Sequence, residues 1–268
     1  MYLCSVKIKE VLSALERFAP LPLQESWDNA GLQVGLTETE VSGALLCLDV
    51  NEAILDEAIA KDCNLVVSHH PLLFRGLKTI SDLTDVQRTV RKAIQNNIAV
   101  ISMHTNMDNA QGGVNFKIAE KLGLQDMRFL VENGPSTGSG TAGSGTVAEL
   151  VEALPAESFI QKVKATFSVE CAMCNALLQR PIQKVAICGG AGDFLLDEAV
   201  KQGADAFITG EMHYHQYFGY DQQIQICVIG HYQSEQFTSE IFREIIAKDC
   251  PDVPTYIAET ITNPILYV

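Results

Sequence analysis

The chain lacks any apolar run that approaches the roughly 18 to 20 residues of a transmembrane helix. Its first residues, MYLCSVKIKEVLSALERF, carry charge from Lys7 onward and lack the apolar region of a signal peptide. Clusters of Lys and Arg are also missing, and 33 Asp and Glu against 19 Lys and Arg give a formal net charge of -14. Such a charge repels nucleic-acid backbones and anionic lipid surfaces. We therefore expect a cytoplasmic protein that binds neither nucleic acid nor membranes.

A complete set of metal-binding cysteines is missing as well. Of the eight cysteines, the one patterned pair is Cys171 and Cys174 in CAMC, and no second pair completes a zinc site. Several others lie in apolar runs such as ALLCLDV and KVAICGG, where cysteine packs as a small hydrophobic residue. The sequence therefore predicts reduced thiols, with the CAMC pair serving only in packing.

Short apolar strands alternate along the chain with amphipathic helices. GALLCLDV predicts a strand, NEAILDEAIAKD a helix capped by Asn51, and CNLVVSH the next strand. Fully apolar strands separated by helices are typical of α/β proteins whose helices cover the sheet faces. Functional residues in such folds gather at the carboxyl ends of the strands.

The Gly-rich stretch NGPSTGSGTAGSGT, residues 133–146, interrupts this alternation. Its composition is that of a flexible linker, and the strand and helix pattern restarts after it. We expect an α/β fold of two interlinked lobes with helices packed on mixed sheets. The first lobe comprises residues 1–130, completed by residues 231–268, and the second comprises residues 131–230.

Histidines are few, yet each of them follows an apolar strand. In NLVVSHHPLLFRG a proline directly after two histidines ends the strand, because proline cannot donate to a sheet ladder. The six histidines are His69, His70, His104, His213, His215 and His231. This common position predicts a shared polar site, although any single histidine could instead be a hydrogen-bonded structural residue.

Two carboxylates accompany the histidines at helical spacing. Asp108 follows His104 by four residues, and Glu235 follows His231 by four. Imidazole together with carboxylate suits Zn, Mn or Fe. Adjacent residues of an extended chain point in different directions, so two neighbouring histidines serve two ions more easily than one. The pattern predicts a dinuclear metal centre.

Seven motifs in order along the chain carry a resemblance to a known family: ESWDNAGLQVG, LDVNEAILDEAI, SHHPLLF, HTNMDNAQGGVN, GGAGD, GADAFITGE and GHYQSE. The sequence resembles the Nif-three-like family, named for NGG-one-interacting factor three, whose bacterial members are often named GTP cyclohydrolase I type 2 homologs. The resemblance implies a two-lobed α/β protein that forms a toroidal homohexamer with dinuclear sites facing a central cavity. It also implies that part of the Gly-rich stretch is ordered.

The metal ligands that the resemblance implies fall on five residues. His70 and Asp108 would hold one ion, His69 and His231 the other, and Glu235 would bridge both. Two divalent transition-metal ions per chain, Zn, Fe or Mn, would then activate water for hydrolysis of a nucleotide or a related small molecule.

Catalytic roles follow from the same resemblance. His104, a ligand or a neighbour of the cluster, and Glu211 are the candidate general acids for a GTP cyclohydrolase-like reaction, and a phosphoester or nucleotide hydrolase would use the same ions. His213 and His215 fall in a variable region and receive no ligand role. The alternative function is a non-catalytic metal-binding or regulatory toroid.

For three features of the sequence, two interpretations remain open. WDNAGLQVG is either a turn that packs Trp27 or a segment that places Asp28 and Asn29 at the cavity. GGAGD is a tight turn between strand and helix, or an anion-binding turn. Glu211 is either a strand-end residue or a general base.

Overall fold

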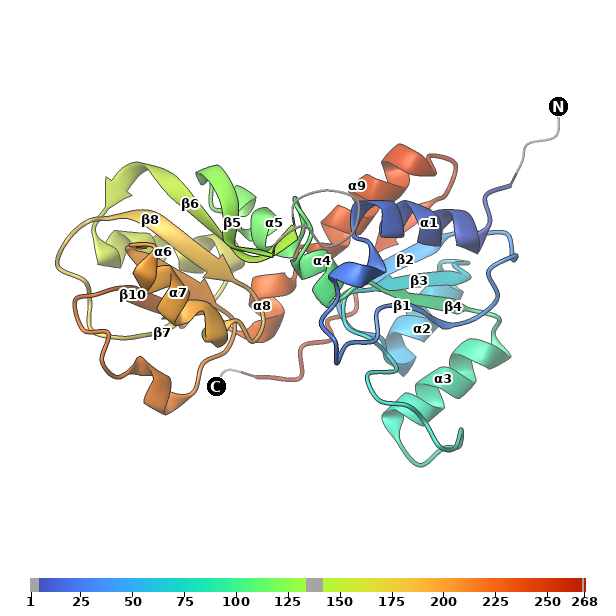
Figure 1. Cartoon of the computed structure of the whole chain (residues 1–268). Coiled ribbons are helices and arrows are strands. Elements are labelled where there is room, and N and C mark those ends of the chain that lie inside the picture. The colour runs from blue at the N-terminus through green and yellow to red at the C-terminus, as the bar shows by residue number, and fades with distance from the viewer. Residues whose placement is uncertain (1–4, 134–141, 267) are drawn as a thin grey trace. The chain divides into compact units, whose positions relative to one another are not determined.

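The computed structural model describes residues 5–133, 142–266 and 268 (Figure 1). The chain forms two compact α/β units, Met1–Met107 with Thr238–Val268 (unit 1) and Asp108–Phe237 (unit 2). The predicted fold class is confirmed: each unit has a mixed sheet with helices packed on it. The units divide within α4 (Thr105–Asp108), not at residue 130, because the helix that follows α4 packs on the sheet of unit 2.

The sheet of unit 1 has five strands in the order β1-β4-β3-β2-β11. They are β1 (Gly31–Val34), β2 (Ala44–Cys47), β3 (Leu65–Ser68), β4 (Ala99–Ser102) and β11 (Thr255–Ile257). Strand β1 is antiparallel to β4, and the other four strands are parallel. Every residue of β2, β3 and β4 is buried, as apolar strands between two helical layers require.

Helices cover both faces of this sheet (Figure 1). α1 (Ile8–Phe18) and α9 (Thr238–Asp249) pack together on one face, and α2 (Glu52–Ala60) and α3 (Asp85–Gln95) on the other. The short helix η1 (Leu21–Leu23) follows α1. The predicted cap is confirmed, since the side chain of Asn51 accepts the Ile54 N–H at 3.0 Å.

The sheet of unit 2 has six strands in the order β5-β6-β8-β9-β10-β7. They are β5 (Gln125–Asn133), β6 (Ala142–Leu154), β7 (Met173–Cys174), β8 (Ile182–Cys188), β9 (Ala206–Thr209) and β10 (Gln225–Val228). Strands β8, β9 and β10 are parallel, and the outer pairings are antiparallel. Residues 142–146, predicted as linker, are the start of β6, because they pair with β5; the rest of that stretch, 134–141, lies outside the described residues.

The helices of unit 2 are α5 (Val114–Lys121), α6 (Ala156–Phe167), α7 (Leu196–Lys201), α8 (His231–Glu235) and the short helices η2 (Asp193–Leu195) and η3 (Tyr214–Tyr217). α5 packs on β5, β6 and β8, and residues of α7 lie in one core cluster with Phe207 and Ile226. A turn at residues 236 and 237 separates α8 from α9. Of the helices that the structure describes, none has both the length and the apolar character needed to span a membrane. The cytoplasmic location stays a prediction.

Candidate metal centre

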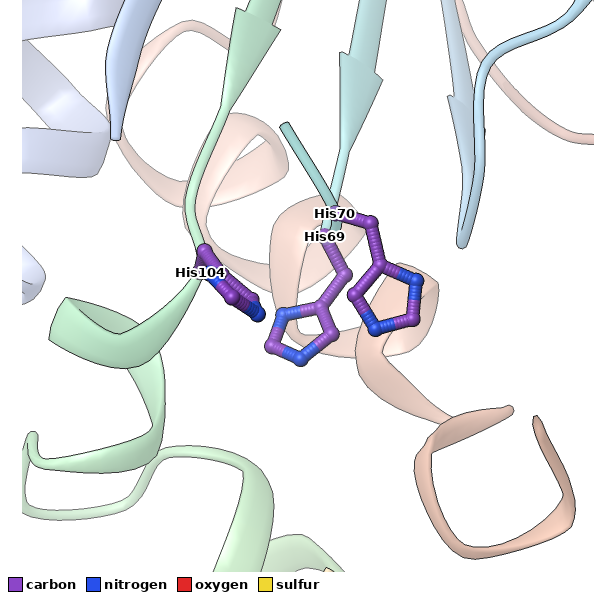
Figure 2. Close-up of side chains that lie close together, drawn as sticks. All are labelled: His69, His70 and His104. Atoms are coloured by element: carbon purple, nitrogen blue, oxygen red, sulfur yellow. The ribbon is translucent and has the colours of Figure 1, made fainter. Parts of the chain in front are cut away.

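Three histidines converge at the carboxyl ends of β3 and β4 in unit 1 (Figure 2). β3 and β4 are parallel with Ser68 opposite Ser102, so the residues that follow them meet at one sheet edge. The ring centroids of His69 and His70 lie 4.9 Å apart, and that of His104 lies 5.2 and 5.4 Å from them. One nitrogen from each ring falls within 4.8 Å of the other two, a separation that one metal ion can bridge.

Each of these imidazoles is held through its Nδ1 atom. His69 Nδ1 lies 2.9 Å from the Met103 carbonyl oxygen, and His70 Nδ1 lies 2.7 Å from Asp49 Oδ1. These partners are acceptors, so Nδ1 carries the proton and donates, and the lone pair is on Nε2. Metal-binding histidines are oriented in this way by carboxylates and carbonyls.

Asp28 performs the same task for His104. Its Oδ1 atom lies 2.8 Å from His104 Nδ1, and its Oδ2 atom accepts hydrogen bonds from the backbone and hydroxyl of Thr105. Burial alone would raise the pKa of Asp28, but the hydrogen bonds from His104 and Thr105 outweigh it and lower the pKa to about 2. Of the two interpretations of WDNAGLQVG, the structure supports the one that places Asp28 at the site, and Trp27 is 57% exposed.

Replacing Asp28 by Asn is expected to destabilise the metal-free protein by about 1–3 kcal/mol at neutral pH, because the amide offers one acceptor oxygen to the donors that the carboxylate satisfies. The folded-state pKa of Asp28 is about 2, below its ordinary 3.8, so its stabilisation is present above pH 4 and is lost as the pH falls toward 2. Urea unfolding in the presence of a chelator from pH 2 to 7 measures the difference. Asp82→Asn, on an exposed loop, is the control, and a difference that does not change with pH would contradict the assignment.

A second group of donors lies in unit 2. His231 is the first residue of α8 and Glu235 the last, and His231 Nε2 lies 3.2 Å from Glu235 Oε2. On the other side of the ring, Nδ1 lies 3.1 Å from Glu211 Oε1. Asp108 and Glu235 both lie near the Cys188 thiol, whose pKa is raised by its burial and, to a smaller extent, by the charges of these carboxylates. Three carboxylates and one imidazole of unit 2 thus share one region.

The GGAGD turn, residues 189–193, packs against the side chain of Glu235. Gly190 has a positive φ of 58°, and a Cβ atom there would lie 2.3 Å from Glu235 Oε1. Its N–H donates to Ser234 Oγ at 2.9 Å, and the Gly189 N–H donates to Asn115 Oδ1 at 2.8 Å. Because side chains of unit 2 accept hydrogen bonds from both of these N–H groups, the structure supports the tight turn of the two interpretations.

The remaining predicted residues lie elsewhere. β9 ends at Thr209, so His213 and His215 do not follow a strand directly; both are exposed beside or within η3. Sequence reasoning missed Asp49, the partner of His70, although it lies just after β2 and obeys the same strand-end rule. It also missed the contact of Gly190 with Glu235, for which the sequence offers no signal beyond the glycine itself.

The fold and the histidine group together define an α/β protein with donor groups suited to a divalent metal ion. A sequence model of the family Duf34/NIF3 (NGG1p interacting factor 3) matches residues 6–264. The chain belongs to this family. The predicted family resemblance is therefore confirmed.

Relatives and solved structures agree with this membership. A Clostridium acetobutylicum protein named GTP cyclohydrolase 1 type 2 homolog is 34% identical over 232 residues, 86% of each chain. A Campylobacter jejuni protein of the same name is 31% identical over 269 residues, covering 98% of this chain and 100% of the relative. The crystal structure of a Staphylococcus aureus protein matches with a TM-score of 0.89 and 25% identity, over 98% of this chain and 99% of that one. A Bacillus cereus protein described as related to NIF3 matches with a TM-score of 0.87 at 25% identity, over the same shares of the two chains.

Proposed function

We propose that the chain binds two divalent transition-metal ions, Zn, Fe or Mn. One observation carries the proposal: three histidines of unit 1 have Nδ1 within hydrogen-bond distance of an acceptor oxygen, which leaves the lone pair on Nε2. They are His69, His70 and His104; His231 lies between two carboxylates, with Nδ1 3.1 Å from Glu211 Oε1 and Nε2 3.2 Å from Glu235 Oε2. Structural histidines have no common need for this tautomer, whereas metal ligands do.

The ligand assignment follows the family pattern. In that pattern His70 and Asp108 would hold one ion, His69 and His231 would hold the other, and the carboxylate of Glu235 would serve both. Five protein ligands for two ions leave coordination positions for water and substrate, as catalytic sites require. The donor set of imidazole and carboxylate supports first-row transition metals over magnesium or calcium.

The activity that this site supports best is hydrolysis of a nucleotide or a related small molecule. When bound, a pair of divalent ions lowers the pKa of water and polarises the electrophile. Relatives with the name GTP cyclohydrolase 1 type 2 homolog support a purine nucleotide as the substrate. Hydrolysis of a phosphoester is the alternative reaction for a hydrolase with these two ions.

We assign proton transfer to His104 and Glu211. Asp28 orients the ring of His104, so that Nε2 is the atom that exchanges the proton. The carboxylate of Glu211 is half-exposed and lies 3.1 Å from His231 Nδ1, so it also orients that ligand. A pH profile of turnover separates the two roles of Glu211, because Glu211→Gln keeps the hydrogen bond and removes the titrating group.

Protein purified without chelator is expected to carry about two transition-metal ions per chain, as dinuclear hydrolases do. Because ligating imidazoles must be neutral, the occupancy should fall as the pH drops below about 6. Elemental analysis measures both, and a screen of nucleotides and phosphoesters, with Asp108→Ala as the inactive control, tests the hydrolase. A metal content near zero after supplementation would refute the dinuclear site.

We further propose a closed homohexameric ring, on the basis of family membership and the general preference of soluble homo-oligomers for closed symmetry. Light scattering at micromolar concentration should give six times the chain mass of 29.3 kDa. A monomer at that concentration would exclude the ring.

The second candidate function is a metal-binding or regulatory scaffold without turnover. Its donors would be the same, but all coordination positions would be closed and the ions would stabilise the fold. The paired variants treated in the Discussion distinguish it from the hydrolase.

A further inference from the structure

Two cysteines far apart in the sequence face one another in the sheet of unit 2. Cys174 of the edge strand β7 lies directly opposite Cys227 of β10 in an antiparallel pair. Residues opposite one another in such a pair have Cα atoms about 4.5–5.5 Å apart, and disulfides form at Cα separations of about 4.4–6.8 Å. No disulfide joins any of the seven cysteines of the described residues, and the register of β7 and β10 places this pair for one.

The two thiols differ in reactivity. A hydrogen bond from Cys227 lowers the pKa of Cys174, which exceeds the opposing effect of burial, and the charge of Lys164 adds to the lowering. The same hydrogen bond, together with burial, raises the pKa of Cys227 well above its ordinary value. Cys174 is therefore the more acidic thiol of the pair.

Access to the pair is from the side of Cys174 alone. Cys174 is partly exposed and lines a cavity of about 530 Å³ with Met173, Tyr214 and Phe218, whereas Cys227 is fully buried. A small oxidant can reach the Cys174 thiol through this cavity, whereas the Cys227 thiol is shielded from solvent.

We propose that Cys174 and Cys227 are a redox modification site that a small hydroperoxide converts to a disulfide. The Cys174 thiolate attacks the peroxide oxygen, the O–O bond breaks, and the leaving oxygen takes up a proton, which leaves Cys174 as a sulfenic acid. The Cys227 sulfur then attacks the Cys174 sulfur, the S–O bond breaks, and the proton of Cys227 leaves with the hydroxyl as water. Two thiols and one hydroperoxide thus give one disulfide, one alcohol or water, and one water.

The bond would link the two-residue strand β7 covalently to its neighbour β10. β7 is the edge strand, and Cys227 lies four residues before His231 on the strand that leads directly to α8. The disulfide would close a loop between residues 174 and 227 and restrict the unfolded chain. Oxidised protein should therefore melt about 5 °C higher than reduced protein, and reduction should reverse the shift.

The test uses the full-length reduced protein, treated with hydrogen peroxide and then alkylated. Before alkylation, the intact mass should be about 2 Da below that of the untreated chain. After alkylation of the unfolded protein, two fewer thiols should be labelled than in the untreated chain, and a non-reduced peptide map should link Cys174 to Cys227. Cys171→Ser, three residues from Cys174 and exposed, is the matched control and should keep the link. Cys174→Ser and Cys227→Ser should lose both the link and the rise in melting temperature.

Three results would overturn the proposal. A link between Cys171 and Cys174 would show that the sequence-local pair reacts instead. Formation of the same mass loss in Cys227→Ser would exclude the cross-strand bond. Oxygen addition at Cys174 without any link would show that Cys227 does not resolve the sulfenic acid.

Discussion

The Gly190→Ala variant is expected to lose about 2–5 kcal/mol of unfolding free energy and to lose metal binding with it, since two separate costs combine at this residue. The backbone of Gly190 has a φ of +58°, which costs an L-residue about 1–2 kcal/mol. The added Cβ would also lie 2.3 Å from Glu235 Oε1 and 3.3 Å from His231 Nε2, so both side chains must move. Urea unfolding and metal titration measure the two effects.

Gly203→Ala is the matched control, because Gly203 has a φ of +70° in the same unit with no atom within 4 Å of the added Cβ. It should show the conformational cost of about 1–2 kcal/mol alone and keep its metal. If the two variants had equal stability and equal metal content, the contact between Gly190 and Glu235 would have no role in the site.

Glu235→Gln is expected to weaken the binding of both ions by more than about 100-fold. Loss of a residue that only hydrogen-bonds to a metal ligand weakens binding by about 10–100-fold, and loss of a ligand to both ions should cost more. The substitution keeps the size of the side chain and removes the negative charge that offsets two dications. His70→Ala should instead remove mainly one ion per chain, because only one ion loses a ligand. Isothermal titration with zinc, after stripping with chelator, measures the affinities and the stoichiometry.

These two variants also decide between hydrolase and scaffold. In a hydrolase, both abolish turnover while the melting temperature of the metal-free protein and the oligomer size stay unchanged. In a scaffold, both lower the stability of the metal-loaded protein or dissociate the oligomer, with no turnover to lose. His215→Ala, an exposed histidine of η3, controls for loss of an imidazole in general and should bind both ions. Normal metal content in Glu235→Gln would disprove the bridging role.

Local residues determined the elements of the fold. The fully apolar strands β2, β3 and β4 and the cap at Asn51 could be predicted, because the burial of each strand and the donor at each helix start depend on residues near it. The sequence also placed His69, His70 and His104 at strand ends, and parallel pairing of β3 with β4 brings these ends together. Motif order along the whole chain was enough to recognise the family.

Other features depend on contacts between distant segments, and only the tertiary structure decided them. Residues 142–146 have the composition of a linker, but β5 offers them a partner for pairing, and hydrogen bonds to that strand outweigh the local flexibility of Gly and Ser. Asp28 and Asp49 became partners of His104 and His70 across 76 and 21 residues of sequence. The sequence predicts only a packing role for Cys174, because Cys171, three residues before it, completes no site. The cysteine opposite Cys174 in the sheet is Cys227, 53 residues later in the chain. Short-range sequence patterns determine which residues are buried and where the chain turns. The hydrogen-bond partners of a polar side chain depend instead on strand order and register, which no local pattern encodes.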